Sequence, residues 1–254
     1  MNRRRLLAAA GLVCVALLAG CFGPSQISDE QLAENATYDW SSEANASYTL
    51  ARSSYAAVFR LSNSTTLAVH DRDALGVEAP VDLSALRYRF PNGTIIDGTH
   101  DGLSATLEQR RTVIDLPVRE GQVAYTASRS GKQFTTPVVV SGQQAVTLPP
   151  GGRVGVPLLS QVSPAGHTTA VMENRMTVTW ENVTGGALTV NYYLQRDLVL
   201  FSLLVLVASA IGIGGIIFYV RQIRRLAARR EDVGLDIEED DDDPRDRGPP
   251  PGMR

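Results

Sequence analysis

The sequence predicts a mainly β fold: an antiparallel, sandwich-like extracellular domain, immunoglobulin-like in outline, followed by one C-terminal transmembrane α-helix. Three observations predict it. The chain opens with an export signal. Residues 47–197 then alternate apolar and polar side chains in short segments that turn residues separate. Finally, residues 198–220 form an apolar run without a charge, and arginines follow it at once.

Residues 1–20 read as an export signal peptide that ends at a lipobox. Three arginines at positions 3–5 are followed by an apolar stretch and then by Leu-Ala-Gly immediately before Cys21. The two adjacent arginines before Leu6 and Leu7 also fit a twin-arginine signal. This ending resembles that of bacterial and archaeal lipoproteins, which implies lipidation of Cys21. Since Cys14 leaves with the signal, the mature chain would then carry no free thiol, disulfide or thiolate metal site.

Residues 21–46 are expected to form a linker that contains one short helix. Gly23 and Pro24 resist regular structure, while Ser28 and Gln31 have the spacing of a capping box. The helix is expected to end near Asn35.

Nine segments of the domain 47–197 have the alternation of strands. They are residues 55–61, 65–69, 86–90, 112–116, 122–127, 134–140, 145–148, 176–180 and 188–193. Such closely spaced short strands predict an antiparallel sandwich or an open barrel. A division into two smaller sheet units near residues 141–155 is a second arrangement that the pattern allows.

Five asparagines in this part of the chain begin an Asn-x-Ser/Thr sequence, the acceptor pattern for N-glycosylation. They are Asn35, Asn45, Asn63, Asn92 and Asn182. With eight asparagines, and with 36 serines and threonines among 254 residues, chance would give about one acceptor. The excess favours an exported domain, with these side chains at its surface.

The run at 198–220 is long enough to cross a bilayer as a helix, and five arginines within the juxtamembrane segment 221–230 place the C-terminus in the cytoplasm. Small residues four apart in the run would allow contact with a second membrane helix. Because the last expected strand ends close to the run, the domain is expected to rest near the outer leaflet. Residues 231–254 carry ten acidic side chains and read as a disordered cytoplasmic tail.

Patterns that indicate catalysis are missing from the sequence. His70, His100 and His167 lack metal-ligand spacing, and the first two are expected in polar hairpin loops. We therefore expect no catalytic, metal or cofactor site, and no enzyme activity. Between residues 22 and 197, 13 basic and 17 acidic residues form no basic stripe, so nucleic acid is not an expected partner.

Three stretches are similar to a haloarchaeal family of uncharacterised membrane-anchored surface proteins. They are residues 87–94, 191–197 and 244–253, and the 23 arginines against one lysine agree with that origin. The resemblance implies location and no activity. We therefore expect a membrane-anchored surface protein with an extracellular binding or structural module, in contact with membrane lipid and an envelope or membrane-helix partner. The alternative is a transmembrane adaptor or signal-relay protein whose acidic tail recruits a partner.

Overall fold

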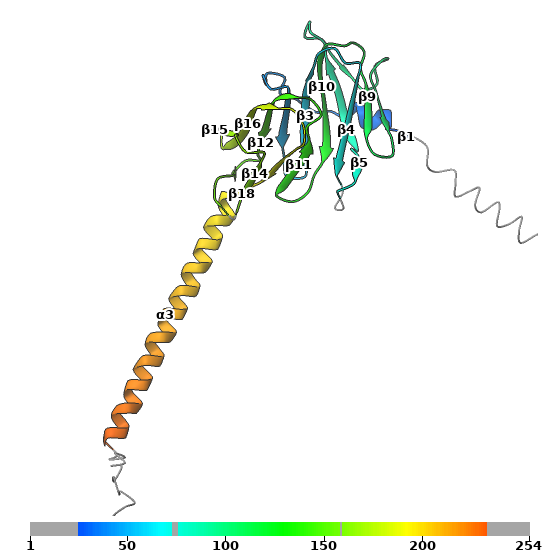
Figure 1. Cartoon of the computed structure of the whole chain (residues 1–254). Coiled ribbons are helices and arrows are strands. Elements are labelled where there is room, and N and C mark those ends of the chain that lie inside the picture. Colours follow the sequence, from blue (N-terminus) through cyan, green and yellow to red (C-terminus); the bar gives the residue numbers. More distant parts are fainter. Residues whose placement is uncertain (1–24, 73–75, 158, 233–254) are drawn as a thin grey trace, which may run out of the picture. The chain divides into compact units, whose positions relative to one another are not determined.

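The computed structural model describes residues 25–72, 76–157 and 159–232. The chain divides into two compact units, residues 1–198 and residues 199–254, and each is considered by itself. The first unit is mainly β with antiparallel sheets, and the second contains most of one long helix. This confirms the fold class that the sequence predicts (Figure 1).

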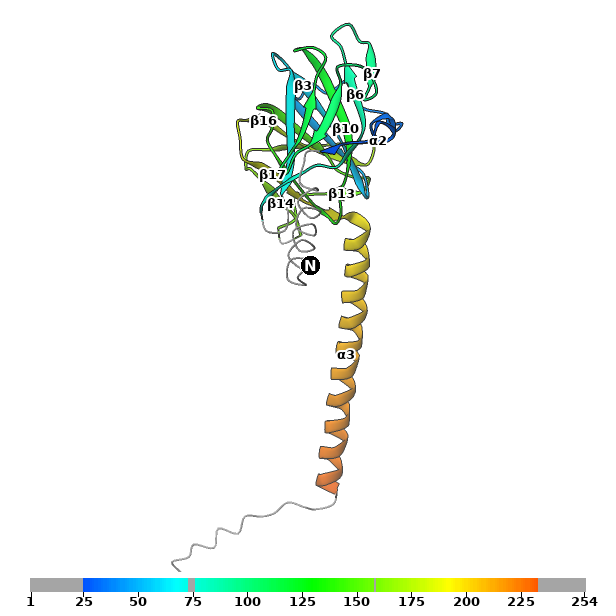
Figure 2. The same ribbon diagram turned by 90° about the vertical axis from the view of Figure 1, so that its right-hand side faces the viewer.

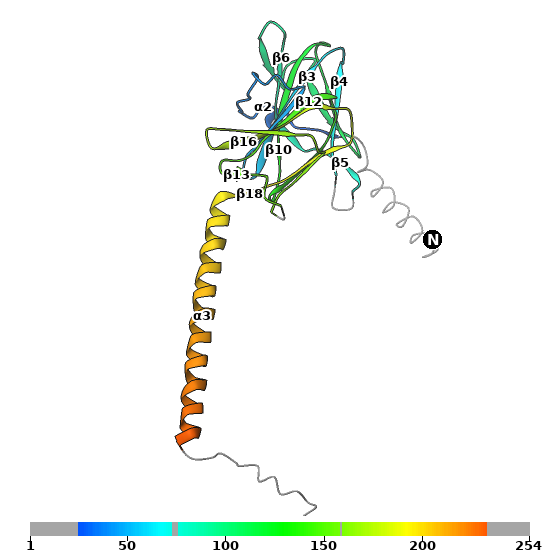
Figure 3. The same ribbon diagram turned by 60° about the vertical axis from the view of Figure 1, so that its left-hand side comes forward.

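An eight-stranded sheet forms the largest part of the first unit. In spatial order its strands are β15 (Thr168–Met172), β16 (Arg175–Val183), β12 (Gly142–Thr147), β2 (Ala46–Leu50), β3 (Ser54–Leu61), β10 (Gly121–Ser128), β6 (Leu83–Arg89) and β7 (Ile95–Asp97). All neighbours are antiparallel except β12 and β2, which are parallel. Because β12 lies inside this sheet, next to β16 as Figure 3 shows, the chain is not divided near residues 141–155.

Three smaller sheets complete the unit. The five-stranded sheet has the order β1 (Ser25–Gln26), β8 (Ser104–Leu107), β9 (Thr112–Asp115), β4 (Thr66–Arg72) and β5 (Glu78–Pro80). The three-stranded sheet contains β11 (Gln133–Pro137), β17 (Ala187–Asn191) and β14 (Gln161–Ser163). The last sheet pairs β13 (Gly152–Arg153) with β18 (Tyr193–Leu194).

One hydrophobic core joins the two large sheets. Val69 and Ile114 of the five-stranded sheet belong to the same buried cluster as Phe59, Tyr88 and Val123 of the eight-stranded sheet. Each such side chain contributes roughly 1.5–3 kcal/mol when it leaves water. The alternation in the sequence thus corresponds to a sandwich in which every second residue faces the opposite sheet.

Helix α2 (Asp29–Ala33) is capped at both ends by side chains. At its start the Ser28 hydroxyl oxygen accepts a hydrogen bond from the Gln31 N–H at 3.3 Å. The Gln31 side chain does not return this bond as a full capping box requires, because its amide donates to Asp82 Oδ1 at 2.6 Å. At the other end, the Arg87 guanidinium donates to the carbonyl oxygens of Leu32, Ala33 and Glu34, which otherwise lack helical partners. Arg87 belongs to β6, the strand that lies close to α2 (Figure 2).

The segment expected as a linker, residues 21–46, differs from that expectation from Ser25 onward. Ile27, Leu32, Tyr38 and Ala44 are buried in it, and β1 pairs with β8. Tyr38 lies in a second small apolar cluster, and its hydroxyl donates to the Ala85 carbonyl oxygen at 2.6 Å. From Ser25 onward the segment is therefore part of the folded unit: it contributes a strand to one sheet and buried side chains to the two apolar clusters.

All nine expected segments contain strands, but their ends and number differ. The segment 188–193 divides into β17 and β18, and β11 ends at Pro137 rather than at residue 140. The sequence pattern did not predict several other strands, because they are short or show no alternation of burial. An example is β15, whose five residues are all exposed.

Helix α3 (Gln195–Asp232) follows β18 directly in the chain. Among the described residues it is the one helix long and apolar enough to cross a membrane, and the candidate span runs from Gln195 to Leu226. The expected run 198–220 lies within it. Apolar side chains along this part of the helix are exposed, as a lipid-facing helix requires.

Candidate functional site

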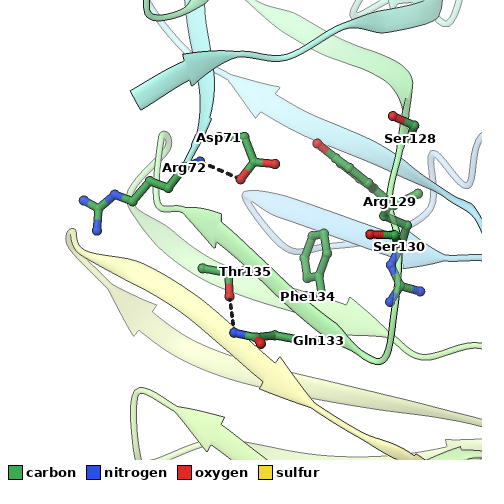
Figure 4. Close-up of a pocket in the computed structure, with 9 residues that line it drawn as sticks. Asp71, Arg72, Ser128, Arg129, Ser130, Gln133, Phe134 and Thr135 are labelled. Carbon is green, nitrogen blue, oxygen red and sulfur yellow. Dashed lines mark hydrogen bonds between the residues drawn. The ribbon is translucent and has the colours of Figure 1, made fainter. Parts of the chain in front are cut away.

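A polar hollow of the first unit lies where β4 ends, β10 ends and β11 begins. It has a volume of about 920 Å³. Polar side chains from these three segments line it together with the ring of Phe134 (Figure 4), and Tyr55 of β3 is the second aromatic residue of the lining, so we call these two rings its base. The lining residues are Tyr55, Asp71, Arg72, Ser128, Arg129, Ser130, Gln133, Phe134 and Thr135, which we call the polar pocket.

The base of the polar pocket is rigid because it is part of the core. Tyr55 and Phe134 are 7% and 4% exposed, and their ring centroids are 5.2 Å apart. Tyr48 packs against both rings, and Tyr125 packs against Tyr55. Burial raises the pKa of Tyr48 to about 12 and raises the pKa of Tyr55 further, so both hydroxyls stay neutral at any physiological pH.

Arg129 is held in place by the backbone around it. Its Nη1 donates to the Ala51 carbonyl oxygen at 2.8 Å and to the Tyr192 hydroxyl at 3.0 Å, while Nη2 donates to the Gly131 carbonyl oxygen at 2.8 Å. The guanidinium carbon lies 5.5 Å from the centre of the Tyr192 ring, within range of a cation–π contact. Among the described residues Arg129 has no carboxylate within ion-pair distance, so its positive charge is not neutralised locally.

The opposite wall of the polar pocket carries one charge of each sign. Asp71 and Arg72 are exposed at the end of β4, and Figure 4 shows Arg72 and Arg129 on opposite sides of Phe134. Asp71 Oδ1 accepts a hydrogen bond from the Arg72 N–H at 2.7 Å, and this fixes the carboxylate. The Gln133 amide donates to Thr135 Oγ1 at 3.4 Å. The pocket thus presents both hydrogen-bond donors and hydrogen-bond acceptors, with two positive charges and one negative charge.

Four of the five expected glycan acceptors are exposed. Asn35 follows α2, Asn63 and Asn92 lie in turns, and Asn182 lies near the end of β16. Asn63 Oδ1 accepts from Arg119 at 3.3 Å, and Asn92 Oδ1 accepts from the N–H two residues on, at 3.0 Å. These contacts involve the amide oxygen only, so they do not occupy the amide nitrogen, which is the atom that would carry a glycan.

Asn45 differs from the other four acceptors because its side chain is built into the sheet. The side-chain Oδ1 accepts a hydrogen bond from the Gln143 backbone N–H at 3.0 Å. The backbone N–H of Asn45 donates to the Gln143 carbonyl oxygen at 2.8 Å. A Cβ added to Gly142 would lie only 2.5 Å from this Oδ1, so the amide packs directly on the glycine. The nitrogen that would carry the glycan, Nδ2, would itself lie 3.2 Å from that Cβ, and Asn45 is half-buried where the other four acceptors are exposed. This geometry argues against a glycan at Asn45 in the folded unit.

The other sequence-predicted positions do not form a site. Cys21 lies outside the described residues. His70 lies within β4 rather than in a loop, because residues 70–72 pair with β5, and its Nε2 is 3.8 Å from Glu78 Oε1. His100 does lie in a turn, where its Nδ1 is 2.8 Å from the Asp101 carbonyl oxygen. Among the described residues no group of three or more His, Cys, Asp or Glu side chains could hold a metal ion.

Sequence reasoning missed the polar pocket. Its residues come from positions 55 to 135 and match no motif, so only the pairing of the strands brings them together. The one available signal was the polar run from Ser128 to Lys132 between two apolar strands, which reads equally well as an ordinary hairpin turn.

The three similar stretches have structural roles where they are described. Arg87 caps α2, and the buried Tyr88 donates from its hydroxyl to the Glu120 carbonyl oxygen at 2.7 Å. Tyr192 supports Arg129, and Asp197 forms an ion pair with Lys132. The third stretch, residues 244–253, lies outside the described residues.

The comparisons with known proteins give a family without an activity. The model of DUF5803, described as a family of unknown function, matches residues 42–238. The match includes the polar pocket and most of α3. A search of curated proteins finds no match.

Proposed function

The chain belongs to DUF5803, a family of unknown function, and we propose that it is a membrane-anchored surface protein that binds a polar ligand in the polar pocket. The proposed topology places the β unit outside the cell, α3 across the membrane and the C-terminus inside. Its support is the apolar, exposed stretch of α3 and the arginines that follow it. Lipidation of Cys21, glycosylation and a haloarchaeal source belong to the same proposal.

The observation that carries the binding role is the polar pocket itself. Its aromatic base is buried in the core, and Arg129 is held by three hydrogen bonds, so this part of the wall is ordered before any ligand arrives. A preformed wall lowers the entropy that binding must overcome. A hollow of about 920 Å³ lies in the range of small-molecule sites.

The chemistry of the lining favours a hydroxyl-rich ligand of the saccharide class. Serine, threonine and glutamine side chains can both donate and accept, while Asp71 accepts and the two arginines donate. A strongly anionic or cationic ligand would meet a charge of its own sign at one wall. We propose a binding rather than a catalytic role for the polar pocket.

The test uses the full chain in nanodiscs and a panel of surface oligosaccharides, with affinities measured by calorimetry. We expect at least one saccharide to bind, and we expect Gln133→Ala and Arg72→Gln each to weaken it roughly tenfold through lost hydrogen bonds. Gln109→Ala and Arg110→Gln are matched controls: both side chains are exposed and lie outside the pocket. They should leave the affinity unchanged.

Two outcomes would overturn the binding role. One is that no saccharide in the panel binds, and the other is that the control variants weaken binding as much as the pocket variants. The topology has its own test: protease added to intact cells should spare the C-terminal tail. The adaptor alternative depends on that tail, residues 231–254, of which the structure describes only the first two.

A further inference from the structure

A second hollow lies at the end of the β unit from which the chain continues into α3. Its volume is about 600 Å³. Three basic side chains line it, each from a different part of the chain: Arg52 after β2, Lys132 before β11 and Arg196 in the first turn of α3. Pro149, Pro150 and Leu194 form its apolar part. We call it the basic hollow.

The backbone holds the walls of the basic hollow together. β13 pairs with β18 in the register Gly152 with Leu194, and the Gln195 N–H donates to the Gly151 carbonyl oxygen at 3.0 Å. On the other side the Tyr192 N–H donates to the Lys132 carbonyl oxygen at 3.1 Å. Arg129 attaches the segment of Arg52, because its N–H donates to the Ser53 carbonyl oxygen at 2.9 Å and its Nη1 donates to the Ala51 carbonyl oxygen at 2.8 Å. Hydrogen bonds therefore hold all three segments that carry the basic residues.

Positive charge predominates in the basic hollow. Asp197 is paired with two of the cations: its Oδ2 is 2.5 Å from Lys132 Nζ, and its Oδ1 is 3.4 Å from Arg196 Nε. It offsets one of three positive charges, and no carboxylate among the described residues lies within ion-pair distance of Arg52.

The position along the chain indicates what the hollow meets. Arg196 stands two positions before the apolar run, and a helix rises only about 1.5 Å per residue. If α3 crosses the membrane, Arg196 lies at the level of the lipid headgroups. We propose that the basic hollow binds the phosphate of an anionic membrane lipid, with Arg52, Lys132 and Arg196 as the donors. Pro149 and Leu194 would contact the apolar part of the same lipid.

This inference depends on the membrane anchoring of the proposed function and is independent of the saccharide site. We propose a lipid as the ligand of the basic hollow because its lining residues Leu194 to Arg196 are followed almost at once by the apolar run. A soluble phosphate would meet the same cations and would not need the apolar wall. The two sources can be separated by experiment.

The experiment places the full chain in nanodiscs that contain phosphatidylcholine with a minor fraction of phosphatidylglycerol. Native mass spectrometry then counts the lipids that stay bound after release into the gas phase. We expect retention of phosphatidylglycerol over phosphatidylcholine. The double variant Arg52→Gln/Lys132→Gln should lose this preference roughly tenfold or more, because basic residues near a membrane surface attract anionic lipid.

The matched control is Arg110→Gln/Arg111→Gln, which removes two exposed positive charges outside the basic hollow. It should retain the preference. Equal retention in both double variants would overturn the proposal. So would displacement of the bound lipid by inorganic phosphate in millimolar excess, which would assign the hollow to a soluble anion.

Carbonate extraction of the same variants distinguishes the two levels of failure. If both double variants stay in the membrane fraction and neither shows a lipid preference, the lipid site is wrong and the anchoring stands. If the unaltered chain is itself extracted, the anchoring is wrong. Thermal unfolding followed by the fluorescence of the buried Trp180 should be the same in both double variants, which shows that they are folded without relying on saccharide binding.

Discussion

Replacing Asn45 by alanine should destabilise the β unit, although the residue looks like a glycan acceptor. The substitution removes the Oδ1 that accepts the part-buried Gln143 N–H at 3.0 Å. A backbone donor left without a partner costs roughly 1–3 kcal/mol. For a unit of this size each kcal/mol lowers Tm by about 2–4 °C, so the expected loss is roughly 2–12 °C.

The control uses the acceptor pattern itself. Ser47→Ala destroys the Asn45-Ala46-Ser47 sequence and leaves the asparagine amide in place, so any effect of losing a glycan appears in both variants. The effect of the hydrogen bond appears only in Asn45→Ala. Exposed or half-exposed positions such as Ser47 usually change stability by no more than about 0.5 kcal/mol.

Thermal unfolding of the full chain in detergent, followed by tryptophan fluorescence, measures both variants, because Trp180 is only 2% exposed in the folded unit. Glycopeptide mass spectrometry of the unaltered protein gives the second readout, and it should find Asn45 without a glycan. Equal Tm values for the two variants would refute the structural role. A fully occupied glycan at Asn45 in folded protein would contradict the close packing of its amide nitrogen against Gly142.

Three other predictions concern the same unit. Gly142→Ala should lower the free energy of unfolding by about 1–3 kcal/mol, because φ is +118° there and the new Cβ would lie 2.5 Å from Asn45 Oδ1; chemical denaturation checks this. Alkaline titration followed by ultraviolet absorbance should show that Tyr48 and Tyr55 do not ionise in the folded state below pH about 12. Because their folded pKa values are raised, the stability they contribute is complete below the unfolded pKa of about 10 and is lost as pH rises from there, so unfolding should set in between about pH 10 and 12. Trp180→Phe removes an indole N–H that donates to a backbone carbonyl oxygen at 2.9 Å, and together with the lost volume it should cost about 2–4 kcal/mol in thermal unfolding.

The fold class was predictable because several strands alternate clearly. Burial alternates residue by residue in β17 and in the first five residues of β4. In β3 and β10 the face opposite the main core is partly buried too, at Val58 and Ala124, which belong to the second small cluster. Residues 25–46 were not recognised as part of the fold, because Ile27, Leu32, Tyr38 and Ala44 have neither strand nor helix spacing. Ile27, Leu32 and Tyr38 are buried in clusters with residues from distant segments, and local periodicity carries no information about such contacts.

The candidate site was less predictable than the fold. Asp71 and Gln133 are separated by 62 positions, and neither lies in a motif. Their meeting depends on contact between β4 and β11, which belong to different sheets. The acceptor asparagines show the opposite case: a motif marks Asn45, and the geometry gives that side chain a different role.

The division of the segment 188–193 shows why alternation predicts burial better than pairing. Leu188, Val190 and Tyr192 are all buried, so the period of two continues unbroken through the segment. The hydrogen-bond partners change within it, because β17 pairs with β11 and β14, whereas β18 pairs with β13. An alternation with period two predicts which face of a strand is buried, but it does not predict which strand pairs with it. That change of partner brings β18 beside the turn at Pro149 and Pro150, and so it builds the basic hollow immediately before α3 begins.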